Sequence, residues 1–464
     1  MPRSIFPRNT SSPLFILFVS MALGVLTFLT FSRMDQLLKG LLFLVPFILV
    51  CYLNKSLLPA ILTFFLFGLL LAFNNFDTVF PEPGSSIEVT GKVKKVYSDD
   101  FFLASGSFLV NGEWKRLPSA IMIKTRSDVE ITPDTGKIFW ASGMLDNLSP
   151  FQMMLDSEVI AYGPTIGLDR FAGNIRKGIV ETLENYGVTN PVIFSTFFGN
   201  KSRLKKEVKN ALKAIGISHI FAVSGLHIGL FFLLVNYFMS LFLLPFIFRN
   251  LASLSITGIY VLTTGPSLSA MRAFLMLFLY VLFRVLDYPQ SSLNILGLSG
   301  IIMLTFSPFD LVQADFQLSY LSTAGILLYI MVKDQKRRSP LVNVLLIGGA
   351  AQGVTLPVSL SLFGSFALLG IPMTFIAVFI YLIPTLVGTV SLLLFDLLKI
   401  KPLAVFFAKG LEYLSNLFES FIVKLSRSAP VIQLEFPLNY FVAFLISVSV
   451  FSLFFFLAHS EQSP

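Results

Sequence analysis

Apolar and polar positions follow one another in long blocks along the chain, and the longest apolar blocks have the length of membrane helices. The first three cover residues 13–31, 37–53 and 57–73, each close to the ~20 residues that span a bilayer. Arg3 and Arg8 precede the first block, as basic residues precede a signal peptide, but no small-residue cleavage site follows it. We therefore expect three consecutive spans, the first of which is not cleaved.

After Pro81, Pro83 and Gly84 the pattern changes to short, polar, alternating segments that continue to residue 165. This period-two alternation predicts a soluble domain of five strands. A small barrel of the OB type fits that number of strands. The predicted strands cover 86–97, 100–110, 115–125, 137–146 and 157–162, with turn signals at Asn111–Gly112 and Pro133–Asp134.

From residue 217 on, apolar blocks dominate again. The block at 366–397 is too long for one straight span, and Pro372 and Pro384 are expected to break it. Residues 403–425 repeat apolar side chains at helical spacing against charged ones, which is typical of an interfacial amphipathic helix. The remaining crossings are expected near 217–244, 251–266, 270–286, 293–306, 316–332, 341–362 and 440–458.

The predicted fold class is therefore a polytopic α-helical membrane protein of about 11 spans, in a range of roughly 10 to 12, with an inserted extracytoplasmic all-β domain of the OB type. A cytoplasmic N-terminus places that domain outside after three spans. The basic side chains of later loops then lie on the inner side, as the positive-inside tendency requires. These residues are Arg249, Arg284, Lys333, Lys336, Arg337 and Arg338. The predicted domains are 1–76, 77–168, 169–400 and 401–464.

The segment 217–230, ISHIFAVSGLHIGL, concentrates polar side chains within apolar surroundings and holds two of the three histidines. Polar groups in hydrocarbon cost free energy unless they are paired or face water. His219, Ser224 and His227 therefore indicate either a polar contact between helices or the lining of a path or reactive site. Gly225 offers a place for the helix to unwind, and irregular backbone at membrane depth requires protein or water partners.

Residues 201–215 predict a short basic amphipathic helix that Gly216 ends. Such a helix lies on the outer side in the orientation above, which contradicts the positive-inside tendency. It either rests on anionic lipid headgroups, shows that the orientation is wrong here, or binds another anion. Its basic residues are Lys201, Arg203, Lys205, Lys206, Lys209 and Lys213, and its apolar stripe is Leu204, Val208, Ala211, Leu212 and Ile215.

Two later positions also place polar groups within apolar blocks. Arg272 costs about 2.5–3.5 kcal/mol at a helix centre, so it should face a partner or an aqueous path, unless it snorkels toward the boundary near Gly265. Asp315, Gln317 and Ser319 begin a further span. Asp315 either caps that helix or lines a lumen together with its two neighbours.

These stretches resemble the signature of the ComEC-type competence proteins over roughly residues 80–400. The resemblance rests on GNKS at 199–202, AVSGLHIGL at 222–230, GPSLSAMRAFLM at 265–276, SPFDLVQADFQLSYLSTAGILL at 307–328 and FGSFALLGIP at 363–372. It implies a multi-pass protein of the bacterial cytoplasmic (inner) membrane whose domain 169–400 forms a channel for single-stranded DNA. Many members add a C-terminal domain resembling metallo-β-lactamases. Only six residues follow Ala458 here, so we expect a short form without that domain, without enzymatic activity and without metal or cofactor.

On this hypothesis two sets of residues meet DNA. The basic residues of 201–213 bind phosphates, and a polar path consists of His219, Ser224, Gly225, His227, Arg272, Asp315, Gln317 and Ser319. The implied partners are single-stranded DNA, a separate cytoplasmic ATP-driven motor and an extracytoplasmic DNA receptor. A separate nuclease and a homo-oligomer are further options. Asn200 stands where a phosphate-binding loop needs glycine before Lys201, so the driving force must come from a motor or an ion gradient.

Composition narrows the class without deciding between functions. A hydrophobic share of 55% and a mean hydropathy of +0.79 exclude an ordinary soluble protein. The single cysteine, Cys51, excludes an internal disulfide. The net charge of +8 suits a nucleic-acid partner or basic cytoplasmic loops. Residues 82–164 hold eight basic and eleven acidic side chains, so the β-domain is not globally basic.

Two other classes of function stay open. Ser224 with His219 or His227 would suit a membrane serine hydrolase, although the sequence identifies neither an orienting carboxylate nor oxyanion donors. An ion- or metabolite-coupled transporter is the other alternative.

Overall fold

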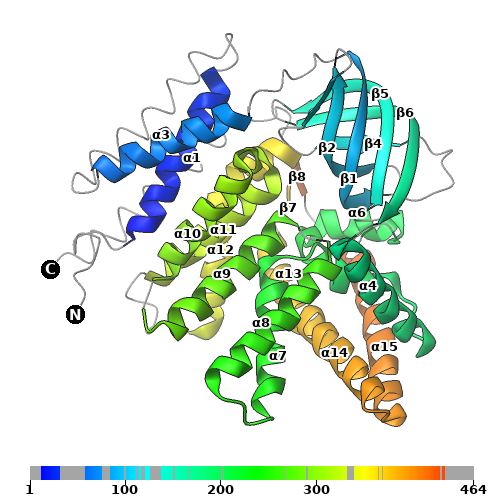
Figure 1. Cartoon of the computed structure of the whole chain (residues 1–464). Coiled ribbons are helices and arrows are strands. Elements are labelled where there is room, and N and C mark those ends of the chain that lie inside the picture. The colour runs from blue at the N-terminus through cyan, green and yellow to red at the C-terminus, as the bar shows by residue number, and fades with distance from the viewer. Residues whose placement is uncertain are drawn as a thin grey trace.

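The computed structural model places a small β-domain beside a larger bundle of helices (Figure 1). The described residues are 12–31, 58–75, 84–98, 101–110, 113–116, 121–125, 137–149, 152–165, 167–199, 201, 203–265, 267–288, 291–331, 339–363, 365–367, 369–428 and 431–433. The predicted spans at 37–53 and 440–458 lie outside them.

The β-domain is a ring of strands closed around an apolar interior. β1 pairs with β2 and β5, β5 with β6, β6 with β4 and β4 with β2; only the β4–β6 pair is parallel. β3 continues β2 as a hairpin. The strands are β1 (Ser86–Ser98), β2 (Phe101–Val110), β3 (Glu113–Arg116), β4 (Ile121–Lys124), β5 (Lys137–Ser149) and β6 (Gln152–Thr165).

Alternating side chains fill this ring, as the period-two pattern predicts. Phe102, Phe108 and Phe139 are fully buried in its core. The sequence predicted one strand over 115–125, and this prediction was wrong. The structure has two strands there, β3 and β4, which pair with different parts of β2.

The N-terminal helices α1 (Pro13–Phe31) and α3 (Leu58–Asn75) cross at two glycines. Gly24 lies against the backbone of Phe65, and Gly68 lies against the backbone of Met21. A Cβ atom at either position would overlap the facing helix, so the absence of a side chain permits this close packing.

The helices of the bundle follow the expected spans closely from residue 268 on and less closely before it. They are α7 (Gly225–Ser240), α8 (Phe246–Thr263), α9 (Leu268–Val285), α10 (Ser292–Phe306), α11 (Ala314–Met331) and α12 (Pro340–Phe363). Within the described residues, four helical segments are long and apolar enough to cross a membrane: 246–263, 268–285, 342–362 and 370–397. Shorter apolar helices lie at 13–27, 58–72, 225–240 and 292–306. The chain is therefore a mostly helical membrane protein with a small β-sheet region.

The expectation that Pro384 breaks the apolar block was wrong, whereas Pro372 lies in the first turn of the helix, where a backbone N–H has no helical partner to lose. α13 (Gly370–Ala377) continues through a π-helical turn, η6 (Val378–Leu382), into α14 (Ile383–Leu397). A proline removes one helical hydrogen bond and its ring clashes with the carbonyl four residues earlier, which for Pro384 lies within the π turn. One continuous helix results.

α15 (Lys401–Ser426) packs along α14 instead of lying alone at an interface (Figure 1). Its buried side chains recur every three or four residues, which makes a seam of the kind seen between paired helices. They are Ala404, Ala408, Leu411, Ser415, Phe418 and Ile422. The apolar side of the predicted amphipathic helix therefore faces protein at Leu411 and Phe418.

Three helices and four short elements complete the fold. The helices are α4 (Leu168–Asn185), α5 (Pro191–Phe198) and α6 (Lys206–Ile215), and the 3-10 turns are η3 (Ser218–Phe221) and η4 (Pro308–Val312). β7 (Ser365–Ala367) pairs with β8 (Val431–Gln433). The ion pair between Lys92 of β1 and Asp169 of α4 joins the β-domain to the bundle.

Candidate functional site

The polar motif lies where the backbone leaves one helix and begins the next. α6 ends at Gly216, whose positive φ of 83° suits glycine. Residues 218–221 then form the 3-10 turn η3, and Ala222 and Ser224 are extended. The span predicted from residue 217 therefore becomes α-helical only at Gly225. The backbone is irregular directly before the Ser224–Gly225 pair, where the sequence predicted an unwound helix.

Ser224 and His227 form the start of α7 together. The His227 Nδ1 atom lies 2.9 Å from the Ser224 Oγ atom and accepts from the Ser224 backbone N–H at 3.3 Å. This arrangement is a capping box in which histidine takes the place usually held by glutamate or glutamine. The His227 side chain has 0% exposure, and its Nε2 atom has no hydrogen-bond partner of standard geometry in the described structure.

Arg272 of α9 is buried, with 6% exposure, inside the bundle. Its Nε–H donates to Ser319 Oγ at 2.8 Å, and its Nη1–H donates to Thr323 Oγ1 at 2.6 Å. The guanidinium also lies 5.7 Å from the ring centroid of Tyr320. Among the described residues no carboxylate forms an ion pair with it. Neutral hydroxyls and an aromatic face thus hold a buried cation.

Gly225 and Arg272 touch, which joins the polar motif to the buried cation. A Cβ atom at residue 225 would lie 2.8 Å from the Arg272 Nη2 atom and 3.4 Å from the Ala273 Cβ atom. A side chain at this position would therefore displace the guanidinium. The glycine permits the first turn of α7 to approach the charged end of Arg272.

Of the residues predicted at the start of α11, only Ser319 reaches this cation. Gln317 is buried, and its Nε2–H donates to the Leu311 carbonyl at 3.0 Å, so it stabilises the junction between η4 and α11. Asp315 is half-buried in the first turn of α11. The site contains Ser269 and Thr323 as well, and Ser319 Oγ donates to Ser269 Oγ at 3.1 Å.

Sequence reasoning missed Ser269 and Thr323. Both stand one helical turn from a predicted residue, Ser269 before Arg272 and Thr323 after Ser319. Residues at this spacing lie on the same side of a helix, so the pattern contained the signal that would have found them.

His219 lies apart from the cation, on η3. Its exposed imidazole approaches Thr374 of α13, with the Nε2 atom 3.4 Å from Oγ1. The neighbouring turn is fixed by Lys201, whose Nζ donates to the Ser218 carbonyl at 2.6 Å and to the Ser218 Oγ at 3.0 Å. Lys201 therefore holds the backbone of the motif.

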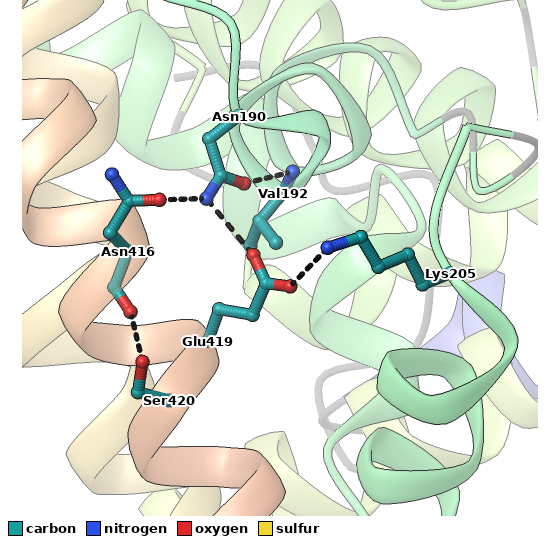
Figure 2. Close-up of polar contacts among 6 residues, drawn as sticks. All are labelled: Asn190, Val192, Lys205, Asn416, Glu419 and Ser420. Carbon is teal, nitrogen blue, oxygen red and sulfur yellow. Dashed lines mark hydrogen bonds and ion pairs between the residues drawn. The ribbon is translucent and has the colours of Figure 1, made fainter.

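The basic segment 201–213 is not a uniform cationic surface. Arg203 pairs with Glu184 at 3.2 Å and lies over the Phe194 ring. Lys205 lies 4.0 Å from Glu419, which also accepts a hydrogen bond from Asn190 Nδ2 at 3.0 Å (Figure 2). By contrast, the side chains of residues 206 and 213 are exposed, and that of residue 209 is half-buried.

The apolar stripe of this segment faces the protein core. The main core cluster contains Leu204, Val208, Leu212 and Ile215. The helix α6 that carries three of them packs against α15. The stripe is therefore covered by protein, and contact of the basic side of the helix with lipid headgroups or another anion stays a prediction.

Polar side chains of α15 bind the loop before α5, and the sequence did not predict this contact. Glu412 accepts from the backbone N–H groups of Thr189 and Asn190, at 2.9 and 3.1 Å, before α5 begins. Asn190 caps α5 by accepting from Val192 N–H, and it donates to Asn416 at 2.8 Å (Figure 2). A carboxylate at a helix start favours that helix electrostatically.

The described residues contain no group of three or more histidine, cysteine, aspartate or glutamate side chains placed to hold a metal ion. The site is thus a buried arginine, a Ser–His helix cap and a set of hydroxyls in a helical membrane protein.

This chain belongs to the competence protein family, whose family model matches residues 196–461. The resemblance to ComEC-type competence proteins is thereby confirmed. The chain is similar to ComE operon protein 3 of Bacillus subtilis (strain 168), with 29% identity over 193 residues, which cover 42% of this chain and 25% of that protein. It is also similar to a protein of Aquifex aeolicus (strain VF5) named only as uncharacterized, with 33% identity over 135 residues, 29% of this chain and 32% of that one. The matched part spans a third or less of these relatives. No solved structure matches the chain significantly.

Proposed function

We propose that this protein acts in DNA uptake during competence, as a channel that carries single-stranded DNA across the cytoplasmic membrane. Membership of the competence protein family and the apolar helices of the bundle support a membrane role in that process. The channel assignment rests on the chemistry of the site. We further propose that the phosphates of the strand pass Arg272.

The observation that carries this proposal is the buried guanidinium of Arg272 without a carboxylate partner in the described structure. Burial of an uncompensated charge is costly, and hydroxyl groups stabilise a cation less than an anion does. A phosphate oxygen accepts a charge-assisted hydrogen bond from a guanidinium N–H. Nε donates to Ser319, and Nη1 donates to Thr323 and to the Met276 sulfur, so Nη2 is the nitrogen left to donate to a passing phosphate.

A transient contact suits transport better than a tight one. Conduction requires binding favourable enough for entry and weak enough for exit. A second buried cation would retain the strand, whereas a single arginine among hydroxyls gives one moderate phosphate site. His227 and Ser224 stabilise the first turn of α7, which holds Gly225 against this site.

We also propose that the closed strand ring is an extracytoplasmic OB-type domain that contacts the incoming strand. Its support is the order of pairing, in which β1 joins both β2 and β5 and the ring closes through the parallel β4–β6 pair. The core phenylalanines are unavailable for stacking. Trp114 on β3 is 49% exposed and can stack on a base. Trp140 is bound through its Nε1–H to Glu88 at 3.3 Å.

On this proposal the chain has no catalytic step. A separate motor or an ion gradient drives the strand, an extracytoplasmic receptor delivers it, and a separate nuclease or a second copy of the chain can complete the apparatus. DNA is the substrate, and no cofactor is needed for binding or passage.

The test measures conversion of labelled duplex DNA into a DNase-protected, single-stranded cytoplasmic form. A deletion strain of a competent host is complemented with wild type, Arg272→Gln, Arg272→Lys or the control Arg170→Gln on exposed α4. Loss of one charge-assisted hydrogen-bonding site costs about 1.5–3 kcal/mol, which predicts roughly a tenfold to hundredfold fall in uptake for Arg272→Gln. Arg272→Lys should keep part of the activity, and the control should keep all of it.

Surface binding of DNA and the amount of protein in the membrane are measured in the same strains. Uptake at the wild-type level in Arg272→Gln would refute the phosphate path. Unchanged uptake in the deletion strain would refute the channel itself.

A membrane serine hydrolase is the second candidate, because Ser224 Oγ and His227 Nδ1 lie within hydrogen-bond distance. The same nitrogen accepts from the Ser224 backbone, and no carboxylate orients His227 among the described residues. A nucleophile needs such an oriented base. Labelling of Ser224 by a fluorophosphonate probe, lost in His227→Leu, would favour the hydrolase over the channel.

A further inference from the structure

One end of the helices α7, α8 and α9 gathers two arginines on a single aromatic ring. Arg249 lies in the first turn of α8, and Arg284 lies in the last turn of α9. Their guanidinium carbons are 6.0 Å and 5.9 Å from the ring centroid of Phe246. The ring therefore holds two positive charges near each other.

These two charges have no anionic partner in the described structure. Neither arginine forms an ion pair with any described carboxylate, and the contact of each with Phe246 is a cation–π contact. The Nε atom of Arg249 is buried and has no hydrogen-bond acceptor. Two adjacent like charges repel, and a buried donor without an acceptor costs free energy. An anion with several acceptor oxygens would relieve both costs.

Beside the two arginines, asparagine side chains are hydrogen-bonded to one another and to the backbone of α8. Asn236 of α7 donates to Asn250 Oδ1 at 3.2 Å and to Ser253 Oγ at 3.3 Å on α8. Asn250 in turn donates to the Phe246 carbonyl at 2.7 Å. This network fixes the α7–α8 turn, and with it the ring that carries the arginines.

The surface around the arginines is apolar. Residues 241–248 read LFLLPFIF, and Phe242, Leu243 and Phe248 are exposed, the last at 65%. Exposed apolar side chains continue along α8 at Leu251 and Ile256. Both α8 and α9 qualify by length and hydropathy as membrane spans, so this exposed surface suits acyl chains.

We propose that Arg249 and Arg284 bind the phosphate of an anionic phospholipid whose acyl chains lie along the exposed apolar side of α8. The combination of a cation pair and an apolar stripe recognises a ligand that is anionic at one end and aliphatic at the other. Basic sites between membrane helices on the cytoplasmic side bind such headgroups. DNA suits the place less well, because the exposed side chains described next to the arginines, from Leu241 to Phe248, are apolar and offer its backbone no further cation.

The test is native mass spectrometry of the full chain in detergent, with added phosphatidylglycerol or phosphatidylcholine. Wild type should retain phosphatidylglycerol preferentially. The double variant Arg249→Gln with Arg284→Gln should bind it about 30-fold more weakly, since each arginine near an anionic surface contributes about 1 kcal/mol. Arg170→Gln on α4 is the matched control and should bind as wild type does.

Equal retention of the two lipids by wild type, or an unchanged preference in the double variant, would overturn the proposal. Soluble glycerol phosphate competing as well as phosphatidylglycerol would assign the site to free phosphate instead. Displacement of the lipid by a single-stranded oligonucleotide would assign it to DNA.

Two additional variants separate folding from binding. Arg249→Lys with Arg284→Lys preserves the charges and should keep most of the lipid preference. Phe246→Leu keeps both arginines but removes the ring that orders them, so it should weaken binding by less than the double glutamine variant. These readouts do not depend on DNA uptake, so failure here leaves the proposed channel unaffected.

Discussion

The basic segment 201–213 and the site around Arg272 differ in the number of their positive charges and in the partners of those charges. The segment has many cations, and several are neutralised or engaged by Glu184, Glu419 or the Ser218 backbone. The Arg272 site has one cation, buried among hydroxyls without a carboxylate in the described structure. A count of lysines and arginines would favour the segment as the place where an anion binds. The geometry favours the single arginine, because no described carboxylate neutralises its charge.

The largest effect on DNA uptake is expected from a substitution that disturbs the Arg272 site. Gly225→Ala places a Cβ atom 2.8 Å from the Arg272 Nη2 atom, so the guanidinium must move away from its position beside α7. We expect DNA uptake to fall by at least about tenfold, since overpacking costs about 1–3 kcal/mol. Uptake is measured as DNase-protected single-stranded DNA.

Gly229→Ala is the matched control on the same helix, because nothing lies within 4 Å of its Cβ position. It should leave uptake unchanged and slightly stabilise α7, since alanine favours a helix over glycine by about 1 kcal/mol. Equal effects of the two alanines would contradict a special role for the contact with Arg272.

A second prediction concerns the helix cap that holds Gly225 in place. Ser224→Ala and His227→Leu should each destabilise the start of α7, by about 1 kcal/mol for the lost serine cap, and His227→Leu should also lower uptake, by less than Gly225→Ala does, while the protein remains in the membrane. Thermal unfolding in detergent measures the stability. The double variant should be less destabilised than the sum of the two, because both changes remove one shared interaction. Additive losses would show that the two side chains act separately.

A third prediction tests the β-domain. Trp114→Ala should weaken binding of a single-stranded oligonucleotide by the purified protein, by about 1–3 kcal/mol if one base stacks on the ring. Phe102→Leu is the contrasting change, because that buried ring supports the core and should alter stability more than affinity. Fluorescence anisotropy of a labelled oligonucleotide measures the affinity, and no change for Trp114→Ala would remove this residue from the contact.

The smallest expected effect is a change in the salt dependence of DNA binding, which should differ between exposed and paired cations of the basic segment. If exposed lysines contact phosphates, Lys206→Gln and Lys213→Gln should each lower the salt dependence of oligonucleotide binding by about one unit of slope. Arg203→Gln should change it less, because Arg203 already pairs with Glu184. Equal slopes for all variants would exclude this segment from phosphate binding.

The sequence by itself determined which parts of the chain form apolar helices and which part forms strands. Long apolar blocks favour buried or membrane helices, and their lengths match the helices α9 to α12 closely. It also singled out Ser224, Gly225, His227, Arg272 and Ser319, since polar groups are conspicuous in such blocks.

Only the tertiary structure decided what those residues contact. Helical periodicity orders residues along one helix, but it does not specify which helix lies opposite. The contact of Gly225 with Arg272, the pairing of Lys205 with Glu419, and the packing of α15 against α6 all join segments far apart in sequence. Pro384 was misjudged because the sequence does not show the π turn at 378–382 that accommodates it within a continuous helix.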